Sequence, residues 1–197
     1  RQRPIRLFLS GPAGGVIGGR IVGAASNISN LLTVDVGGTS AEIALISDNK
    51  PLLRQEGLID GFPIRVAMVD VNTLGAGGGS IARIDAVGGL RVGPDSAGSN
   101  PGPACYGQGG ENATVTDASV VLGYIDPQYF AGGTFKLDPM LAERVVEDGI
   151  AKPLGMNKYE AALGIHRVLN ARMVEGIRLV SVQQGIDPRG FTLVPLG

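Results

Sequence analysis

The stretch from Leu31 to Leu45 constrains the fold more than any other part of this sequence. A short apolar segment runs into Asp35, then through the corner Gly37-Gly38-Thr39-Ser40 into an alternating apolar segment. β-Prone segments on both sides of a Gly-Gly corner predict a β-hairpin over residues 31–47. Successive backbone N–H groups at such a corner can form an anion-binding concavity. The tip is therefore a candidate phosphate site, and an ordinary β-turn between two core strands is the alternative.

Each residue of the tip has a chemical role under the phosphate interpretation. Gly37 and Gly38 lack a Cβ, so their backbone can approach a ligand closely. Thr39 and Ser40 add hydroxyl donors, and these four residues are the candidate cofactor-binding set. Asp35 offers a carboxylate for a hydrated metal ion and is the candidate catalytic and metal-binding residue.

A second glycine-rich corner, Gly75-Ala76-Gly77-Gly78-Gly79-Ser80, follows an expected strand at residues 64–71. It is not a dinucleotide fingerprint, because Ser80 stands where the final glycine is required. It is not a phosphate-binding Walker loop either, because no Gly-Lys-Ser/Thr follows. The corner is either a flexible turn or a ligand-facing one, and Gly77, Gly78 and Gly79 are its candidate cofactor-binding residues.

Composition narrows the class of protein. The chain of 197 residues holds 32 glycines in discrete clusters, 44% hydrophobic residues and a formal net charge of −1. No basic block argues for nucleic acid, and no apolar run approaches the roughly 20 residues of a membrane span. A single cysteine excludes an internal disulfide and favours a reducing, cytoplasmic compartment. The sequence begins without Met and stops in an expected strand, which indicates a piece of a longer protein.

The N-terminal third is expected to contain a strand, a helix and short strands. Residues 5–10 are typical of a strand, and Ser10-Gly11-Pro12 is typical of a helix start. Glycines four residues apart between Gly14 and Gly23 predict a smooth helical stripe over residues 10–25, with a flexible glycine loop as the alternative. Further strands are expected at residues 52–56, 64–71 and 81–85.

The C-terminal half is expected to be helical after a long loop. Residues 86–117 are too rich in Gly and Pro for regular structure. A helix capped by Asp138 is expected to end before Pro153. A second helix is expected over residues 157–184, with an Asn157–Glu160 capping box and a stop at Gly185. Its small residues Ala161, Ala162 and Gly164 are expected to meet the glycine stripe of residues 10–25.

Single reactive residues carry weaker expectations. Cys105 lies in a Pro/Gly-rich stretch with no nearby histidine, so a structural thiol is favoured over a nucleophile. His166, the only histidine, is expected to pack in mid-helix. Asp117 is interpreted either as a site residue or as a cap, and Asp70 and Asp85 have no assigned role.

Five ordered motifs resemble one family across essentially the whole chain. They are Ser10-Gly11-Pro12-Ala13-Gly14-Gly15-Val16, Asp35-Val36-Gly37-Gly38-Thr39-Ser40, Gly75-Ala76-Gly77-Gly78-Gly79-Ser80-Ile81-Ala82, the pair Val92–Gly98 and Pro101–Gly107, and Thr114-Val115-Thr116-Asp117-Ala118. In this order they are similar to the A subunit of ATP-dependent hydantoinases, a family shared with 5-oxoprolinase and the acetone carboxylase β subunit.

The resemblance implies an α/β fold. It implies the second lobe of an actin-like (ribonuclease H-like) ATPase fold, with a mixed sheet, connecting helices and a glycine/proline-rich loop insertion. Residues 1–197 would form one hydantoinase A-type domain within a larger chain. Its parts would be a first connecting helix (10–25), a phosphate-binding hairpin region (31–56), a glycine-rich insertion (64–135) and a helical part (138–184). The second connecting helix, 157–184, would cross the first.

The resemblance also implies function. The parent would use ATP and Mg²⁺ to phosphorylate a carbonyl oxygen of a cyclic amide, with Gly37, Gly38, Thr39 and Ser40 at the γ-phosphate. The alternatives are an ATP-using subunit of a ketone carboxylase, or a module that is inactive alone. A hydantoinase B-type subunit is the implied partner, with no nucleic acid and no membrane.

Two positions depart from the family pattern. Ala41-Glu42 stand where members typically carry Thr-Asp, so one hydroxyl is lost and one carboxylate is a methylene longer. Asn72 occupies a position where many hydantoinase-like members carry His and oxoprolinase-like members can carry Asn.

Overall fold

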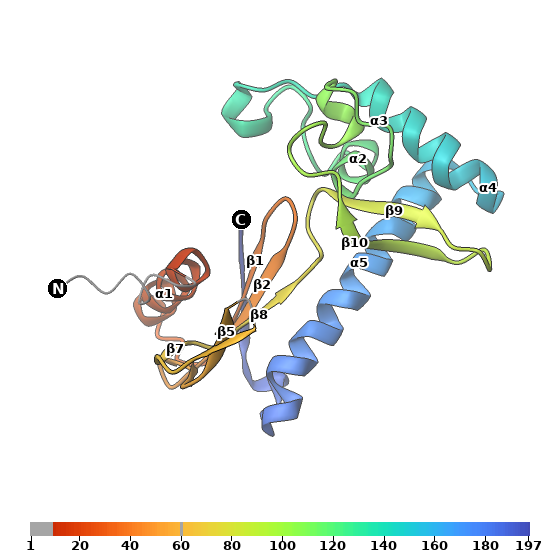
Figure 1. Cartoon of the computed structure of the whole chain (residues 1–197). Helices are drawn as coiled ribbons and strands as arrows, with labels where there is room; N and C mark the ends of the chain where they lie inside the picture. The colour runs from red at the N-terminus through yellow and green to blue at the C-terminus, as the bar shows by residue number, and fades with distance from the viewer. Residues whose placement is uncertain (1–9, 60) are drawn as a thin grey trace. The chain divides into compact units, whose positions relative to one another are not determined.

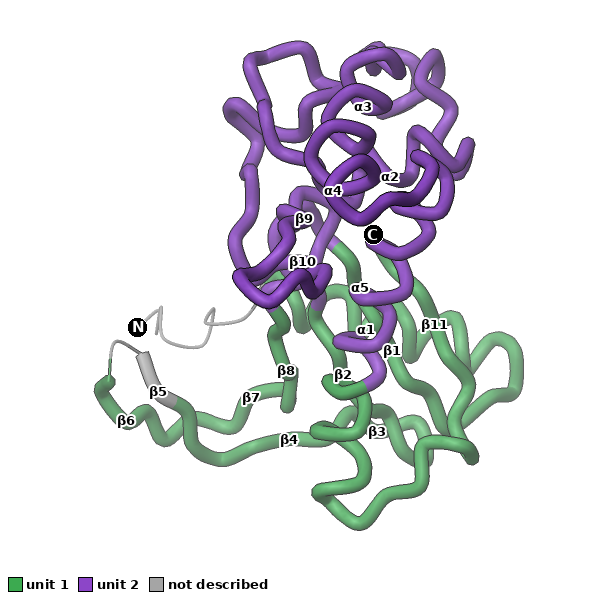
Figure 2. The backbone as a smooth tube through the Cα atoms, turned by 90° about the vertical axis from the view of Figure 1, so that its right-hand side faces the viewer, with its two compact units in different colours: residues 1–36, 42–74, 175–197 green, residues 37–41, 75–174 purple. Residues whose placement is uncertain are grey.

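The structure, a computed structural model, describes residues 10–59 and 61–197 (Figure 1). The expected strand at residues 5–10 lies outside this range except for Ser10, where helix α1 (Ser10–Ala25) begins. The chain forms two compact units (Figure 2). Unit 1 holds residues up to Val36, Glu42–Leu74 and Glu175–Gly197, and unit 2 holds Gly37–Ala41 and Gly75–Val174.

Unit 1 is built on a mixed five-stranded sheet. Its strands are β1 (Leu31–Val36), β2 (Ala41–Ser47), β3 (Lys50–Pro51), β8 (Val71–Leu74) and β11 (Thr192–Leu196). They run in the order β11-β1-β2-β3, with β8 also paired to β2. β11 is parallel to β1, while β3 is antiparallel to β2. The predicted hairpin over residues 31–47 is confirmed, and its strands lie inside the sheet.

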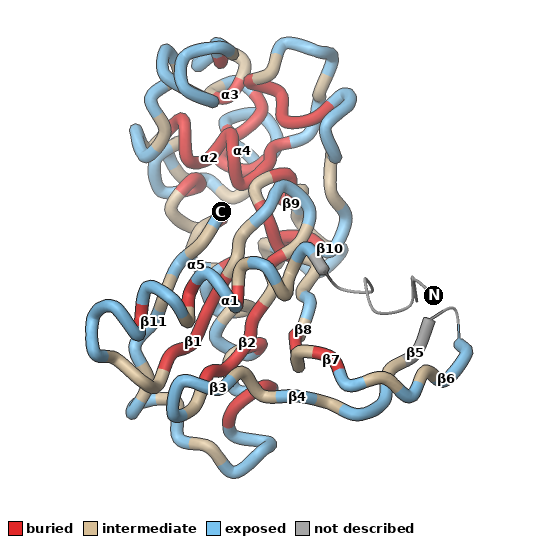
Figure 3. Tube along the Cα trace, turned by 90° about the vertical axis from the view of Figure 1, so that its left-hand side faces the viewer, coloured by how far each residue is buried: buried red, intermediate tan, exposed pale blue. Residues whose placement is uncertain are grey.

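Alternation along β1 and β2 creates two cores, one on each face of this sheet. Leu31 and Ile46 pack with Val16 of α1 on one face. Leu32 and Leu45 pack on the other with Val180, at the end of helix α5 (Lys158–Val180). Figure 3 shows the buried stretches that follow β1 and β2. Val16 of α1 and Val180 of α5 therefore lie on opposite faces of this sheet, and the expected crossing of the two helices stays a prediction.

The glycine stripe of α1 packs on a strand. A methyl group at Gly19 would lie 2.7 Å from Thr33 Cγ2, and Gly15 and Gly23 also contact β1 side chains. Ala161, Ala162 and Gly164 belong to unit 2, where a Cβ at Gly164 would meet Leu90, and their expected contact with this stripe stays a prediction. Small residues allow close approach by any flat neighbour, so their spacing does not identify that neighbour.

The short strands of unit 1 differ from expectation. The strand expected at 52–56 is only β4 (Leu53–Arg54), and the one expected at 64–71 is broken into β6 (Phe62–Ile64), β7 (Met68–Val69) and β8. β7 pairs with β4, while β8 pairs with β2. The chain changes sheets at Asp70, so one apolar run serves two pairings. β5 (Gly57–Ile59) pairs with β6 in a separate hairpin.

Unit 2 contains an antiparallel pair followed by helices. β9 (Ser80–Ile84) confirms the strand expected at 81–85. The expectation of no regular structure over residues 86–117 is wrong at β10 (Leu90–Ser96), which pairs with β9. Pro94 and Gly93 lie where the register shifts between Val92 and Ser96, an irregularity that accommodates both residue types.

The helices of unit 2 begin at side-chain caps. α2 (Val115–Val121) begins at a Thr114–Asp117 capping box. α3 (Pro139–Val146) is capped by Asp138, as expected, and the Asn157–Glu160 box at the start of α5 is confirmed. α5 ends at Val180, before the expected stop, and the left-handed Gly185, with φ 73°, instead ends the short 3₁₀ helix Val182–Gln184. Short 3₁₀ helices cover Ala104–Tyr106, Phe130–Gly133, Val182–Gln184 and Pro188–Gly190.

The helical rod of α3 does not end before Pro153. It continues through a π turn (Glu147–Ala151) into α4 (Lys152–Leu154), which stops at the left-handed Gly155. The Lys152 N–H bonds back to the Glu147 carbonyl across the wide turn. A π turn breaks the regular i to i−4 ladder, and proline is tolerated at such a break. Within the described residues, no helix is long and apolar enough to span a membrane.

Candidate functional site

The two glycine corners lie against each other within unit 2. The Gly78 N–H donates to the Gly37 carbonyl oxygen at 3.0 Å, and the Gly79 N–H donates to that of Gly38 at 2.6 Å. A methyl group at Gly77 would lie 2.6 Å from the Gly37 oxygen. Only glycine permits this approach, because the facing atoms are backbone. The seven candidate cofactor-binding residues therefore belong to one cluster, which we call the glycine corner: Gly37, Gly38, Thr39, Ser40, Gly77, Gly78 and Gly79.

Residues 77–79 are held in place by hydrogen bonds and support the hairpin tip at residues 37–38. The Gly77 N–H donates to Ser80 Oγ at 2.9 Å, so the N–H groups of Gly77, Gly78 and Gly79 are all bonded to protein. The Gly78 carbonyl accepts from both the N–H and the hydroxyl of Thr116, at 2.8 and 2.9 Å. These bonds fix the shape of the corner from behind.

Two backbone N–H groups at the hairpin tip have no acceptor among the described residues. The Gly37 N–H donates to the Ser40 carbonyl at 2.9 Å, which closes the turn. The N–H groups of Gly38 and Thr39 donate to no residue within the described part of the chain, and both residues are exposed. Ser40 is partly buried beside them. The N–H groups of these two exposed residues and the Thr39 hydroxyl form a set of donors suited to an anion.

Residues 96–98, to which sequence reasoning assigned no role, also reach the corner. Ser96 Oγ lies 3.4 Å from Thr39 Oγ1 and accepts the Gly98 N–H at 3.1 Å. The Ala97 N–H donates to the Gly79 carbonyl at 2.9 Å. In the sequence these residues belong to the motif Val92–Gly98, which carries the family resemblance but does not indicate which residues they contact.

Asp35 ends β1 in unit 1, where Leu196 of β11 is its register partner. Its carboxylate is partly buried against α1, and a methyl group at Gly15 would lie 3.0 Å from Oδ2. Among residues 10–59 and 61–197 it has no hydrogen-bond or ion-pair partner, so it is available to a cation. No group of three potential metal ligands occurs in that same range. A magnesium ion held by one carboxylate, phosphate oxygens and water fits such a setting.

Asp117 is a structural cap. It is fully buried, and its carboxylate accepts the N–H groups of Cys105 at 2.8 Å and Thr114 at 3.0 Å, together with the Thr114 hydroxyl at 2.7 Å. A weaker bond from the Ala104 N–H measures 3.3 Å. All of these donors are internal, so Asp117 holds the 3₁₀ turn of residues 104–106 onto the start of α2.

Cys105 and His166 are packing residues. Burial, and then the negative charge of Asp117, raise the pKa of the Cys105 thiol far above its ordinary value, so it remains protonated. Burial lowers the pKa of His166, whose Nε2 lies 3.1 Å from Ser119 Oγ. The Ser119 hydroxyl donates to the Val115 carbonyl, and the Tyr124 ring packs edge-on at 5.3 Å from the imidazole.

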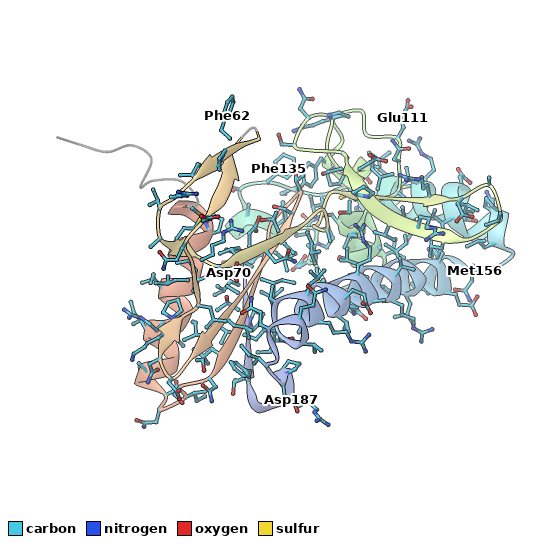
Figure 4. The ribbon with its side chains drawn as sticks, turned by 60° about the horizontal axis from the view of Figure 1, so that its bottom comes forward. Phe62, Asp70, Glu111, Phe135, Met156 and Asp187 are labelled. Atoms are coloured by element: carbon cyan, nitrogen blue, oxygen red, sulfur yellow. The ribbon has the colours of Figure 1, made fainter. Side chains whose placement is uncertain are left out.

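Asp85 and Asp70 hold loops. The hydrogen bond from Arg91, and then the one from the Gly89 N–H, lower the pKa of Asp85 at the β9–β10 turn. Asp70, labelled in Figure 4, accepts from the Gln184 amide at 2.9 Å within unit 1. Neither residue belongs to the glycine corner.

Known proteins resemble this chain in sequence and in structure. The α subunit of caprolactamase from Pseudomonas jessenii is 44% identical over the whole chain, which covers 28% of that protein. 5-Oxoprolinase 1 of Arabidopsis thaliana is 34% identical over 98% of the chain, and 16% of that protein is covered. The chain thus spans less than a third of these relatives.

Solved structures agree. The crystal structure of the ATP-dependent caprolactamase from Pseudomonas jessenii superposes with a TM-score of 0.89, over the whole chain and 28% of that protein at 44% identity. The nucleotide-free structure of acetone carboxylase superposes with a TM-score of 0.83 at 33% identity, over 93% of the chain and 26% of that protein. The profile of the hydantoinase/oxoprolinase family matches residues 1–197. The chain therefore belongs to the hydantoinase/oxoprolinase family.

Proposed function

We propose that the chain is the phosphate-binding part of an ATP-dependent enzyme that opens cyclic amides. The glycine corner is the single observation that carries this proposal. It holds two exposed residues, Gly38 and Thr39, whose N–H groups have no acceptor among the described residues, on a backbone fixed by hydrogen bonds to residues 77–79. The relatives add the substrate class, because caprolactamase and 5-oxoprolinase are named for cyclic amides.

The residues fit a nucleotide phosphate. Gly38 and Thr39 would bind phosphate oxygens through their N–H groups, while Gly37 and Ser40 hold the turn in shape. Asp35 would hold a magnesium ion through water, as a carboxylate without a protein partner in the described range. Bound ATP would supply a phosphoryl group that makes a carbonyl carbon easier to attack. Phosphoryl transfer needs positioning and charge neutralisation, which these residues can provide.

The wider setting is also proposed. We infer an actin-like ATPase lobe, because the mixed sheet covered by α1 and α5 is compatible with one. A hydantoinase B-type partner is supported by the name of caprolactamase subunit alpha, which implies a second subunit. A cytoplasmic location rests on the single buried, reduced cysteine.

Purified full-length parent, with any partner subunit, tests the proposed reaction. We expect ATP-dependent ring opening of at least one of hydantoin, 5-oxoproline and caprolactam. Asp35→Asn and Thr39→Val should each lower kcat/KM about tenfold or more, because charge-assisted contacts to phosphate are lost. Asp126→Asn is the matched control, an exposed carboxylate that only caps a turn. Equal ATP affinity and rate in all three variants and the wild type would contradict the proposal.

A ketone carboxylase subunit is the second candidate. The superposition on acetone carboxylase favours it. ATP consumption that depends on acetone and bicarbonate, with none on cyclic amides, would select this function. The isolated chain is expected to hydrolyse ATP negligibly under either function, since it covers less than a third of its relatives.

A further inference from the structure

Ser96 lies beside the hairpin tip although 57 residues separate it from Thr39. It ends β10, and the partly buried side chain points to the exposed Thr39 hydroxyl. A methyl group at Gly79 would lie 2.9 Å from Ser96 Oγ, so the glycine at that position is what lets the hydroxyl reach the tip. The end of the motif Val92–Gly98 therefore lies at the glycine corner.

Among the described residues, the Ser96 hydroxyl proton has only a long hydrogen bond, to Thr39. Ser96 Oγ accepts the Gly98 N–H at 3.1 Å, and the Ser96 hydroxyl donates to Thr39 Oγ1. The distance of 3.4 Å to Thr39 Oγ1 is well beyond the roughly 2.7 Å of a good O–H···O bond. Two hydroxyls at this separation can both donate to a single oxygen placed about 2.7 Å from each.

The same corner contributes the Gly38 and Thr39 N–H groups, which have no acceptor among the described residues. These two N–H groups and the hydroxyls of Thr39 and Ser96 are donors that one acceptor-rich ligand can satisfy together. A phosphate group offers several acceptor oxygens and negative charge, so it satisfies more of these donors than a neutral carbonyl does.

We propose that Ser96 is a further phosphate-binding residue, whose hydroxyl shares one oxygen of the terminal phosphate of ATP with the hydroxyl of Thr39. This inference rests on the proposed function, since it refines the same site. Residues 96–98 then form one wall of the phosphate site, and the Gly98 N–H orients the Ser96 hydroxyl by donating to its oxygen.

The test uses the full-length parent and measures the affinity for a non-hydrolysable ATP analogue and for ADP. Ser96→Ala should weaken the ATP analogue about tenfold or more, as a lost bond to a charged group does, and should leave ADP unchanged. Ser99→Ala is the matched control, an exposed serine three residues along the same loop. A loss of affinity for both nucleotides, or for neither, would overturn the assignment to the terminal phosphate.

A double-mutant cycle tests the shared oxygen. Thr39→Val alone should also weaken the ATP analogue, and the double variant with Ser96→Ala should lose less than the product of the two single losses. Losses that multiply would show two independent contacts and overturn the sharing. If the KM for the amide substrate rises and the ATP affinity does not, Ser96 binds the other substrate. A wild-type parent with no affinity for ATP would instead refute the proposed function itself.

Discussion

At Gly77 a single methyl group decides whether the two glycine corners can touch. Its Cβ would lie 2.6 Å from the Gly37 oxygen and 2.8 Å from the Gly38 carbonyl carbon, and neither backbone atom can turn aside. We expect Gly77→Ala in the full-length parent to weaken binding of an ATP analogue more than about tenfold, because the tip must shift. Gly149→Ala, which would meet nothing within 4 Å, is the control. Unchanged affinity in Gly77→Ala would separate the second corner from the site.

Asp117 makes a residue-scale prediction about stability. In Asp117→Asn, an amide NH₂ would face N–H and O–H donors in a fully buried position. We expect the free energy of unfolding to fall by about 2 kcal/mol or more, measured by urea unfolding. The exposed Asp126→Asn should change it by less than about 0.5 kcal/mol. Similar values for both variants would mean that the buried cap contributes little.

The raised pKa of Cys105 predicts its reactivity. The thiol is buried and protonated, so the nucleophilic thiolate is scarce in the folded chain. Iodoacetamide at pH 8 should label Cys105 far more slowly in the native chain than in urea, as mass spectrometry would measure. Rapid labelling of the native chain would restore the nucleophile interpretation.

At the scale of an element, substitutions at the adjacent Gly18 and Gly19 of α1 distinguish the effect of helix propensity from the effect of packing. Gly18 meets nothing within 4 Å, so Gly18→Ala should stabilise the helix by up to about 1 kcal/mol. At Gly19 the same methyl group would lie 2.7 Å from Thr33 Cγ2, and Thr33 is buried and bonded to the Ala44 carbonyl. Gly19→Ala should therefore lower the thermal unfolding midpoint while Gly18→Ala raises it. Shifts of the same sign would mean that α1 does not pack on β1 in this way.

Caps and turns were predictable for most elements, and sheet membership was not. Asp138 and Asn157 act through neighbours within a few residues, so their local patterns were sufficient. The run of residues 64–71 could not be divided in advance, because β7 and β8 differ only in the strands they join. β10 was missed since its Pro94 lies at a register shift that only the pairing with β9 defines.

At the scale of the whole molecule, protonation of His166, the only histidine in the sequence, makes the free energy of unfolding depend on pH. Burial lowers its folded pKa below the ordinary 6.5, so the unfolded chain binds more protons between these two values. Its contribution to stability is present above about pH 6.5 and is lost as the pH falls through the folded pKa. His166→Gln should flatten the change in unfolding free energy between pH 7 and pH 5. An unchanged slope would assign that dependence to other groups.

The sequence by itself determined the hairpin over residues 31–47, the helix caps and the glycine-rich character of two corners, because these depend on local backbone geometry. Only the tertiary structure decided that Gly77–Gly79 support the hairpin tip and that their N–H groups donate to other groups of the chain. It also decided that α1 packs on β1, and that Ser96 reaches Thr39 across 57 residues. The physical reason is the same in each case: a residue's type fixes what it can donate, accept or tolerate nearby, while the partner is set by chain segments far away in sequence.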